Sequence, residues 1–592
     1  MLQTLKKYWN YDNFRPLQAE IIQSILDGRD TLALMPTGGG KSLCFQVPTM
    51  VMGGLCLVIT PLIALMKDQV ENLKKRDIRA AAIYTGMSYE QQKTALDNCQ
   101  WGPYHFLYVS PERLESEEFR ERLSRLPICL IAVDEAHCIS QWGYDFRPSY
   151  LKIAEIRNLV GERRRGEEAK RQEVPILALT ATATPEVVDD IQDRLAFREK
   201  HVLRKSFARP NISYVVRQTN KKADEIVHIL SRVPGSAIVY VRNRQRAQEL
   251  AAYLQEKGIS ADFYHAGLTS KERSEKQKAW KKFRERSQGE LQAAYSLETR
   301  GERQEARGEG TRVIVATNAF GMGIDKADVR VVIHHDLPDT IEAYFQEAGR
   351  AGRDEQKAFA VLLYNPSTDK AKARKRVADN YPEEEFLHTV YHKTCNYLGV
   401  GADSGQGATF FLDVYDLCRK MHLPIIPTYS ALHLLSQMGY FSFDEDQEIQ
   451  PRVWIRVQRR ELDNYNLTGP QMALLESLMR EYTGIFTDLQ YVRNIDEYTH
   501  KQLIALAEKR VVSYVSRTVA NVLRLTVNRQ AELRIPEQFY TTRKDHYVDK
   551  LKAMVEYADN QLYCRSQLLL SYFGEHDAAT CKTCDICRKN RS

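Results

Sequence analysis

Residues 31 to 42 read Thr-Leu-Ala-Leu-Met-Pro-Thr-Gly-Gly-Gly-Lys-Ser, an apolar run that passes through three glycines into a helical pattern. The apolar part has the length and composition of a buried parallel strand, which predicts an α/β layer. Glycines there let backbone N–H groups face a phosphate, and the dipole of the following helix favours the same anion. Lys41 can then reach the β- and γ-phosphates of a nucleotide, while the Ser42 hydroxyl can bind Mg²⁺. The residues expected to contact the nucleotide here are Thr37, Gly38, Gly39, Gly40, Lys41 and Ser42.

An acidic tetrapeptide, Asp134-Glu-Ala-His137, follows another apolar run at 128–133. In a nucleotide hydrolase, an aspartate at such a strand end holds magnesium through water, and a glutamate orients or deprotonates the attacking water. Alone, these residues are often a solvated turn. The glycine segment alone could also be a plain turn, because Met35 stands where the usual phosphate-loop pattern begins with glycine. Together the two segments predict nucleotide hydrolysis with Lys41, Asp134 and Glu135 in the catalytic set.

Short apolar runs alternate with helical patterns along the first 365 residues, which predicts two α/β domains in tandem. The runs expected to form strands of the first domain are 31–35, 55–60, 105–109, 128–133 and 176–180. Those expected in the second domain are 237–241, 261–264, 313–316 and 331–334. A mixed-charge stretch at 284–311 has little to bury and is expected to be a loop or a solvated helix.

The composition is that of a globular protein of several domains, with 592 residues, 43% hydrophobic and 27% charged. No apolar stretch approaches the roughly 18 residues that a membrane helix requires. The first residues lack the apolar core of a secretory signal, so we expect a cytoplasmic protein without a membrane partner. The formal net charge of +7 permits nucleic-acid binding without demonstrating it, since local clustering sets a phosphate-binding field.

Four of the eleven cysteines are grouped near the end of the chain. They are Cys564, Cys581, Cys584 and Cys587, two CxxC steps that share a cysteine behind a distant first one. This spacing suits one tetrahedral zinc, and four thiolates leave no position for a catalytic water, so we expect a structural metal. A redox CxxC is the alternative, but it would need only two cysteines. The other seven are scattered singly and are expected to be reduced core residues.

The segment 408–460 changes character and has a winged-helix signature. Thr428 is expected to cap a helix that Gly439 ends, followed by a hairpin of the β-rich runs 440–443 and 452–457. A similar unit is expected after Thr499, with a helix through Lys509 and strands at 511–515 and 522–527. The glycine-rich segment 398–407 reads as a linker. We expect at least one unit to contact DNA, the alternative being two packing modules that never do.

The chain resembles superfamily-two helicases, and more narrowly the RecQ DNA helicase family, over most of residues 1–365 and the last thirty residues. Residues 11–18, Tyr-Asp-Asn-Phe-Arg-Pro-Leu-Gln, look like the family's adenine-reading element. The resemblance implies that Gln18 pairs with the base, that Tyr11 stacks on it, and that Arg15 belongs to the same site. The segment 564–587 is very close to the RecQ zinc-binding subdomain.

Residues 138–150, Cys-Ile-Ser-Gln-Trp-Gly-Tyr-Asp-Phe-Arg-Pro-Ser-Tyr, look like the RecQ aromatic-rich loop. Trp142 and Phe146 offer flat faces for unstacked bases, and Arg147 offers a cation for phosphate. Relatives often have histidine where this chain has Tyr144, so the resemblance assigns that residue no role. Residues 179–183, Leu-Thr-Ala-Thr-Ala, look like the motif that links the nucleotide state to domain movement.

Residues 346–354, Gln-Glu-Ala-Gly-Arg-Ala-Gly-Arg-Asp, resemble helicase motif VI. Arg350 and Arg353 are expected one helical turn apart, so that both project towards a γ-phosphate held by the first domain. We expect Arg353 to be the arginine finger, because a planar guanidinium stabilises transferring phosphoryl charge. A surface ion pair is the alternative for either arginine.

The resemblance implies two tandem RecA-like parallel-sheet domains (1–207 and 208–365), winged-helix-like modules with a linker (366–535) and a helical zinc-binding subdomain (536–592). It implies an ATP- and Mg²⁺-dependent 3′ to 5′ DNA helicase with a structural Zn²⁺, acting in recombination and repair in the bacterial cytoplasm or nucleoid. The implied partners are single-stranded DNA, duplex DNA with a 3′ tail and a single-stranded-DNA-binding protein, and the implied state is a monomer.

The order of the domains departs from the resemblance. Most relatives place the zinc unit directly behind the second motor domain, whereas here the winged-helix-like modules come between them.

Two other functions stay open. One is an RNA helicase or a translocase that does not unwind, since the hydrolytic motifs are shared. The other is a binding module that uses nucleotide only as a switch, against which the presence of both Glu135 and Arg353 argues.

Overall fold

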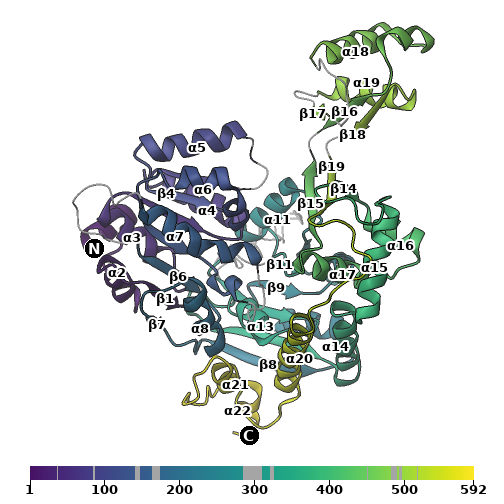
Figure 1. Ribbon diagram of the computed structural model, residues 1–592. Coiled ribbons are helices and arrows are strands. Elements are labelled where there is room, and N and C mark those ends of the chain that lie inside the picture. The colour runs from purple at the N-terminus through teal and green to yellow at the C-terminus, as the bar shows by residue number, and fades with distance from the viewer. Residues whose placement is uncertain are drawn as a thin grey trace, which may run out of the picture. The chain divides into compact units, whose positions relative to one another are not determined.

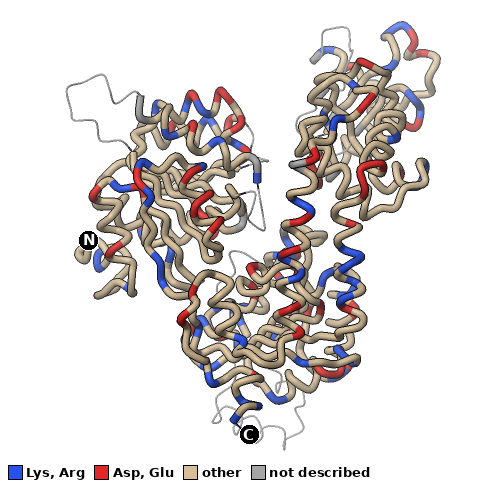
Figure 2. The backbone as a smooth tube through the Cα atoms, turned by 60° about the horizontal axis from the view of Figure 1, so that its bottom comes forward, with Lys and Arg blue, Asp and Glu red and all other residues tan. Residues whose placement is uncertain are grey.

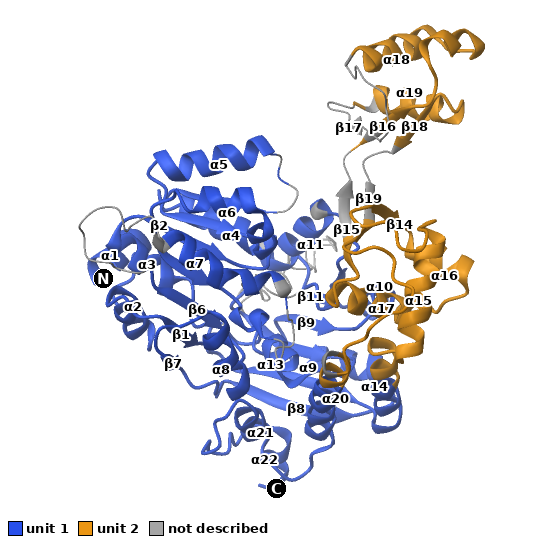
Figure 3. Cartoon of the chain, viewed as in Figure 1, with its two compact units in different colours: residues 1–374, 545–592 blue, residues 375–544 orange. Residues whose placement is uncertain are grey.

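The computed structural model describes residues 1–36, 38–84, 87, 89–140, 147–162, 174–283, 310–320, 326–449, 451–481, 490–491, 496–515 and 518–591. They form two compact units, residues 1–374 with 545–592 and residues 375–544 (Figure 3). Among the described helices, none combines the length and the apolar character that a membrane crossing requires. The functional domain boundaries at 207, 365 and 535 stay predictions.

The first domain is built on a seven-stranded parallel sheet of order β3-β4-β2-β5-β6-β1-β7 (Figure 1). Its strands are β1 (Thr31–Leu34), β2 (Leu55–Ile59), β3 (Ala80–Ile83), β4 (Phe106–Val109), β5 (Ile128–Val133), β6 (Ile176–Thr180) and β7 (Val202–Arg204). One face packs against α1 (Leu2–Trp9), α2 (Gln18–Leu26), α3 (Leu43–Met52) and α4 (Ile63–Lys74). The other packs against α5 (Tyr89–Trp101), α6 (Glu117–Leu123), α7 (Ile153–Glu162) and α8 (Pro185–Arg194). Burial on both faces explains the continuous apolar strands.

The second domain repeats this architecture with a six-stranded parallel sheet of order β10-β11-β9-β12-β13-β8. The strands are β8 (Ile212–Gln218), β9 (Ser236–Tyr240), β10 (Ala261–Tyr264), β11 (Val313–Ala316), β12 (Val329–His334) and β13 (Ala358–Tyr364). Its helices are α9 (Lys222–Arg232), α10 (Arg244–Glu256), α11 (Ser270–Lys282), α13 (Ile341–Ala348) and α14 (Pro366–Asn380). The predicted tandem of parallel-sheet domains is confirmed. Most of the mixed-charge stretch, 284–309, lies outside the described residues.

Asp30, directly before β1, joins three segments of the first domain. Its side chain is fully buried and accepts hydrogen bonds from the backbone N–H groups of Ile176 and Arg198, both at 3.0 Å. The buried Arg157 guanidinium donates to both carboxylate oxygens at 2.9 Å. Burial alone would raise the pKa of Asp30, but the hydrogen bonds from Arg198 and Ile176 and the charge of Arg157 outweigh it and lower that pKa.

We expect Asp30→Ala to reduce the free energy of unfolding of this domain by about 3–5 kcal/mol, because it leaves the Arg157 charge buried without its partner. The pKa of Asp30 is lowered in the folded protein. Its contribution to the free energy of unfolding is therefore fully present above the unfolded-state pKa of about 3.9, and it is lost as the pH falls through the folded-state pKa. Urea unfolding at pH 7 and below pH 4 would measure it. The exposed Asp27→Ala is the control, and equal midpoints for the two variants at pH 7 would contradict the assignment.

Unit 2 contains two small antiparallel sheets, of order β14-β19-β15 and β17-β16-β18. The first includes β14 (Thr409–Leu412), β15 (Phe441–Ile449) and β19 (Thr518–Leu525), and it packs on α15 (Glu384–Tyr397), α16 (Val414–Met421) and α17 (Ile425–Gln437). The second includes β16 (Arg452–Ile455), β17 (Gln490–Tyr491) and β18 (Val512–Val515), with α18 (Gly469–Glu481) and α19 (Glu497–Glu508). The segment 398–407 is a loop between α15 and β14.

The two predicted hairpins are wrong. Strand β15 pairs with β19, where Phe441 lies opposite Leu525 and Phe443 opposite Leu523. Strand β16 pairs with β18 instead, and Val453 and Val512 belong to the core of that second module. Pairing therefore follows shared burial rather than proximity in sequence. The module of β16 to β18 is inserted between the two strands of another sheet.

The predicted helix starts in unit 2 are also wrong by a few residues. Helix α17 begins three residues before Thr428, and the Thr428 hydroxyl donates a hydrogen bond to the carbonyl of Pro424 at 2.7 Å. Asp496 caps α19 by accepting from the backbone N–H of Thr499 at 2.7 Å. A threonine inside a first helical turn can bond to a preceding carbonyl, so its presence does not identify the cap.

The last helices are α20 (Glu537–Asp559), α21 (Arg565–Tyr572) and α22 (Asp585–Lys589). Residues 545–592 belong to unit 1, where α21 packs on α13 and α22 on β8. The Lys550 ammonium lies 3.0 Å from the Glu342 carboxylate of α13, with both side chains mostly buried. The end of the chain thus covers the helix that precedes the two candidate arginines.

Candidate nucleotide and zinc sites

The carboxyl ends of β1, β5 and β6 bring the predicted nucleotide residues together. These strands are adjacent in the order β5-β6-β1, so the segments that follow them emerge at one edge of the sheet. The glycine loop follows β1, Asp134 and Glu135 follow β5, and residues 181–183 follow β6. Ligand sites of open α/β sheets lie at this edge. Thr37 lies outside the described residues.

The glycine loop is held by residues of the predicted adenine-reading element. The Arg15 guanidinium donates to the Gly38 carbonyl at 2.7 Å, and Gln18 Nε2 donates to the Gly40 carbonyl at 3.0 Å. Gly40 has a φ of 79°, and a Cβ built on it would lie 2.4 Å from Gln18 Nε2, so only glycine fits there. In this structure the Gln18 amide supports the loop, a contact that the sequence did not predict. Tyr11 is half exposed.

Lys41 and Ser42 stand at the start of α3. The Lys41 Nζ is buried and has no hydrogen-bond partner in the described part of the chain. The Ser42 hydroxyl accepts from Gln69 Nε2 of α4 at 3.2 Å, and nothing in the motif predicted Gln69. A buried cation without a partner is costly unless an anion completes its environment. The site therefore fits a phosphate group.

Asp134 and Glu135 turn sharply out of β5. Glu135 has a φ of 49°, an uncommon left-handed conformation for a glutamate, and its backbone N–H donates to Asp134 Oδ1 at 3.0 Å. Burial, and then the charge of Glu135, raise the pKa of Asp134 to about 6, while the charge of Lys41 partly opposes them. A carboxylate that resists ionisation in this way is stabilised as an anion by a bound cation. Asp134 therefore fits a magnesium ligand.

His137 joins the acidic segment to the end of β6. Its Nδ1 lies 2.9 Å from the Thr180 hydroxyl and 3.5 Å from Glu135 Oε2. The Thr180 hydroxyl donates to the Thr182 carbonyl at 3.1 Å, so its oxygen remains free to accept from a protonated Nδ1. The predicted coupling motif at 179–183 is thus in contact with the acidic motif. His137 is the last residue of the acidic tetrapeptide. Its place in that motif could have indicated from sequence that it lies at this site.

The two candidate arginines are not arranged as predicted. Helix α13 ends at Ala348, and Arg350 and Arg353 lie in the turn after it, where Gly352 takes a left-handed φ of 55°. A Cβ built on Gly38 would lie 3.5 Å from Arg353 Cγ, so this side chain reaches the glycine loop of the first domain. Arg350 is buried and lies near Tyr240 of β9, whose pKa burial raises and Arg350 lowers in part. The two arginines therefore have different surroundings.

The predicted DNA contacts lie largely outside the described residues, which include neither Trp142, Tyr144 nor Phe146. Arg147 is described, and its guanidinium lies 3.7 Å from the Glu112 carboxylate. Lys and Arg are interspersed with Asp and Glu along the backbone of both units (Figure 2). The distribution of charged residues along the backbone therefore does not identify where a nucleic acid would bind.

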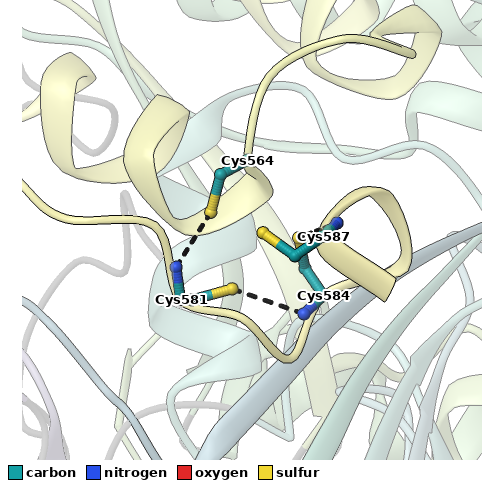
Figure 4. A group of neighbouring side chains, drawn as sticks. All are labelled: Cys564, Cys581, Cys584 and Cys587. Atoms are coloured by element: carbon teal, nitrogen blue, oxygen red, sulfur yellow. Dashed lines mark hydrogen bonds between the residues drawn. The ribbon is translucent and has the colours of Figure 1, made fainter. Parts of the chain in front are cut away.

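The four C-terminal cysteines meet in one cluster (Figure 4). Their Sγ atoms all lie within 4.8 Å of one another. Backbone N–H groups donate to sulfur at 3.3 Å from Cys581 to Cys564, at 3.3 Å from Cys584 to Cys581 and at 3.4 Å from Cys587 to Cys584. Hydrogen bonds of this kind stabilise thiolates, and four sulfurs at such spacing can surround one zinc at Zn–S distances of about 2.3 Å. The donor set fits tetrahedral zinc.

Three family models match the chain. The DEAD/DEAH box helicase model matches residues 15–191, and the helicase conserved C-terminal domain model matches residues 221–355. The RecQ zinc-binding model matches residues 526–588 and so includes all four cysteines. The first match includes β1 to β6 of the first sheet, the second includes β9 to β12 of the second sheet, and the third includes most of the last three helices.

Curated relatives match about two thirds of this chain. A Haemophilus influenzae protein named ATP-dependent DNA helicase RecQ is 40% identical over 67% of this chain and 60% of its own length. A Bacillus subtilis protein named probable ATP-dependent DNA helicase RecS is 40% identical over 62% of this chain and 66% of its own length. The chain thus spans about three fifths of the length of these relatives. Among solved structures, the helicase MrfA bound to DNA is 18% identical, with a TM-score of 0.48, over 74% of this chain and 60% of that one.

Proposed function

Because the chain belongs to the RecQ family of superfamily-two helicases, we propose that it is an ATP-dependent DNA helicase that unwinds duplex DNA in the 3′ to 5′ direction. The observation that carries the proposal is the contact of Arg353, from the second sheet domain, with the glycine loop of the first. A site completed by two domains changes when either domain moves, which is what a motor requires.

In the proposed reaction, Lys41 binds the β- and γ-phosphates, and Ser42 with Asp134 holds Mg²⁺, which neutralises charge on the phosphate oxygens. Glu135 orients or deprotonates the attacking water. His137 keeps the Glu135 carboxylate close to the end of β6. Arg353 stabilises the charge that develops on the transferred phosphoryl group, and Arg350 acts with it in closing the two domains on the nucleotide. Tyr11, Arg15 and Gln18 select adenine, and Thr37 binds phosphate with the rest of the glycine segment.

The proposed DNA site includes the aromatic-rich loop with Trp142, Phe146 and Arg147. This loop is continuous in sequence with the acidic motif, so DNA binding there can displace Glu135 and stimulate hydrolysis. The zinc cluster has a structural role, since four sulfurs leave no open position on the metal. We further propose a monomeric cytoplasmic protein of recombination and repair that contacts a single-stranded-DNA-binding protein.

Unwinding of duplexes that carry either a 3′ or a 5′ single-stranded tail tests the polarity. We expect ATP-dependent strand separation of the 3′-tailed duplex only, because a 3′ to 5′ motor loads on that tail. Separation of the 5′-tailed duplex alone would reverse the polarity. Unwinding of neither, with DNA-stimulated ATP hydrolysis intact, would identify a translocase.

Stimulation of ATP hydrolysis by single-stranded DNA and by RNA of matched sequence tests the substrate class. We expect DNA to stimulate turnover and RNA to have a much smaller effect. Stronger stimulation by RNA would favour an RNA helicase. A rate that neither polymer changes would reject the motor itself.

A further inference from the structure

The segment between the two sheet domains contacts the turn that carries the candidate arginine finger. We call residues 205–211 the linker and residues 349–353 the arginine turn. The Arg209 guanidinium of the linker donates to the carbonyls of Gly349 at 3.1 Å, Ala351 at 3.0 Å and Gly352 at 3.0 Å. Three carbonyls can converge on one guanidinium only while the turn keeps this shape.

Asn211 reinforces the same turn from the end of the linker. Its Nδ2 donates to the carbonyls of Gly352 at 2.7 Å and Gln356 at 3.0 Å. A Cβ built on Gly352 would lie 2.5 Å from Asn211 Nδ2, so the linker approaches the backbone of the turn closely. The Arg209 and Asn211 side chains together donate to the carbonyls of Gly349, Ala351, Gly352 and Gln356, all of which follow α13.

The zinc-binding subdomain fixes the other end of the linker. Glu575 accepts from the backbone N–H of Phe207 at 2.7 Å and from the Ser206 hydroxyl at 2.6 Å. The Phe207 ring is fully buried, with ring centroids 5.1 Å from Phe573 of the subdomain and 6.1 Å from Phe345 of α13. Glu575 therefore sets the position of the linker backbone two residues before Arg209.

We propose that Arg209 is a positioning residue for Arg353, and that Glu575 of the zinc-binding subdomain acts on the same turn through the linker. The inference rests on the proposed ATP hydrolysis and deepens it. Without Arg209, three carbonyls lose a common donor and the turn can relax, which moves Arg353 away from the glycine loop. Catalytic groups tolerate such displacement poorly, because stabilisation of the transition state depends on their placement. The zinc-binding subdomain thereby influences turnover as well as stability.

Steady-state ATP hydrolysis by Arg209→Ala, in the presence of single-stranded DNA, tests the role of Arg209. We expect kcat to fall about tenfold to a hundredfold, with little change in ADP affinity, because the residues that bind the nucleotide lie in the first domain. Binding of ADP with aluminium fluoride, which mimics the transferring phosphoryl group, should weaken in parallel. Arg209→Lys should recover part of kcat, since an ammonium keeps the charge but not the fork of donors.

The control is Lys205→Ala in the same linker, since the Lys205 side chain makes no hydrogen bond or ion pair in the described part of the chain. It should keep the kcat of the unaltered protein. Thermal unfolding and zinc content of each variant separate positioning from loss of fold. A kcat for Arg209→Ala equal to that of the control would overturn the inference. If the unaltered protein does not hydrolyse ATP, the proposed function fails instead.

A double-mutant cycle tests the route from the zinc-binding subdomain. Glu575→Ala should lower kcat several-fold with zinc still bound, because the Glu575 carboxylate bonds to the linker and is not one of the four sulfur ligands. If both residues act through the linker, the fold-decrease in kcat of the double variant will be smaller than the product of the fold-decreases of Arg209→Ala and Glu575→Ala. Fully multiplicative effects, or an unchanged kcat for Glu575→Ala, would reject the coupling.

Discussion

Lys41→Ala is expected to reduce DNA-stimulated ATP hydrolysis by at least about 10²–10³-fold, the cost of losing one preorganised donor at a charged transition state. The Lys41 Nζ is buried and makes no hydrogen bond in the described structure, so it is available to bind a phosphate. Because the Lys41 Nζ makes no hydrogen bond in the described structure, its loss should change the melting temperature little. Steady-state hydrolysis with single-stranded DNA and a thermal unfolding curve measure both effects.

Lys75→Ala is the matched control for this variant. Lys75 lies in the same domain, but its side chain is exposed and forms an ion pair with Glu71 at 2.9 Å. Surface pairs of this kind contribute little, so both activity and stability should be close to those of the unaltered protein. If Lys41→Ala hydrolyses ATP at a similar rate to this control, the glycine loop is not the phosphate site.

Cys584→Ser is expected to lower the bound zinc and the soluble yield, and to unfold the last helices. Cys584 is fully buried, and its sulfur accepts from the backbone N–H of Cys587. Structural zinc contributes on the order of 10 kcal/mol to the folding of small domains, so a weakened site affects the whole subdomain. Because this subdomain covers Phe207 and Phe345, its loss also exposes apolar surface beside α13. Metal analysis and thermal unfolding measure these effects.

Cys99→Ser separates loss of metal from loss of a buried thiol. Cys99 is buried in the first domain and lies outside the cluster of four. We expect this variant to retain its zinc and to lose only a small part of its stability. Full zinc content and normal unfolding of Cys584→Ser would show that the cluster has no structural role.

The predicted strands of the sheet domains were accurate because each is a short apolar run buried on both faces, as β5 shows with six buried residues in succession. Four strands were missed: β3 and β7 of the first sheet, and β8 and β13 of the second, which have seven residues each. Strand β3 has the weakly distinctive sequence Ala-Ala-Ala-Ile, and β7 has three residues, none of them fully buried. The signal of β3 and β7 is too weak for a periodicity argument. Strand β8 is exposed towards its end, which weakens its apolar pattern, whereas β13 is a clear apolar run.

Strand pairing in unit 2 could not be predicted from local pattern. The run at 440–443 is followed closely by the run at 452–457, which favours a hairpin on distance alone. The structure instead pairs Phe443 with Leu523, eighty residues away, because these side chains share one core. The local sequence of an apolar strand does not indicate which other strands and helices share its core. The insertion of one module into another was missed for that reason.

The chemical types at the nucleotide and zinc sites were determined by the sequence itself, because short motifs with fixed spacing, such as Gly-Lys-Ser and Cys-x-x-Cys, dictate which atoms are available as ligands. Only the tertiary structure decided which side chains meet. Arg353 reaches Gly38, Gln18 supports the glycine loop, and Arg209 holds the turn beside Arg353. These contacts join segments far apart in the chain. They arise from the packing of whole domains, which no local pattern records.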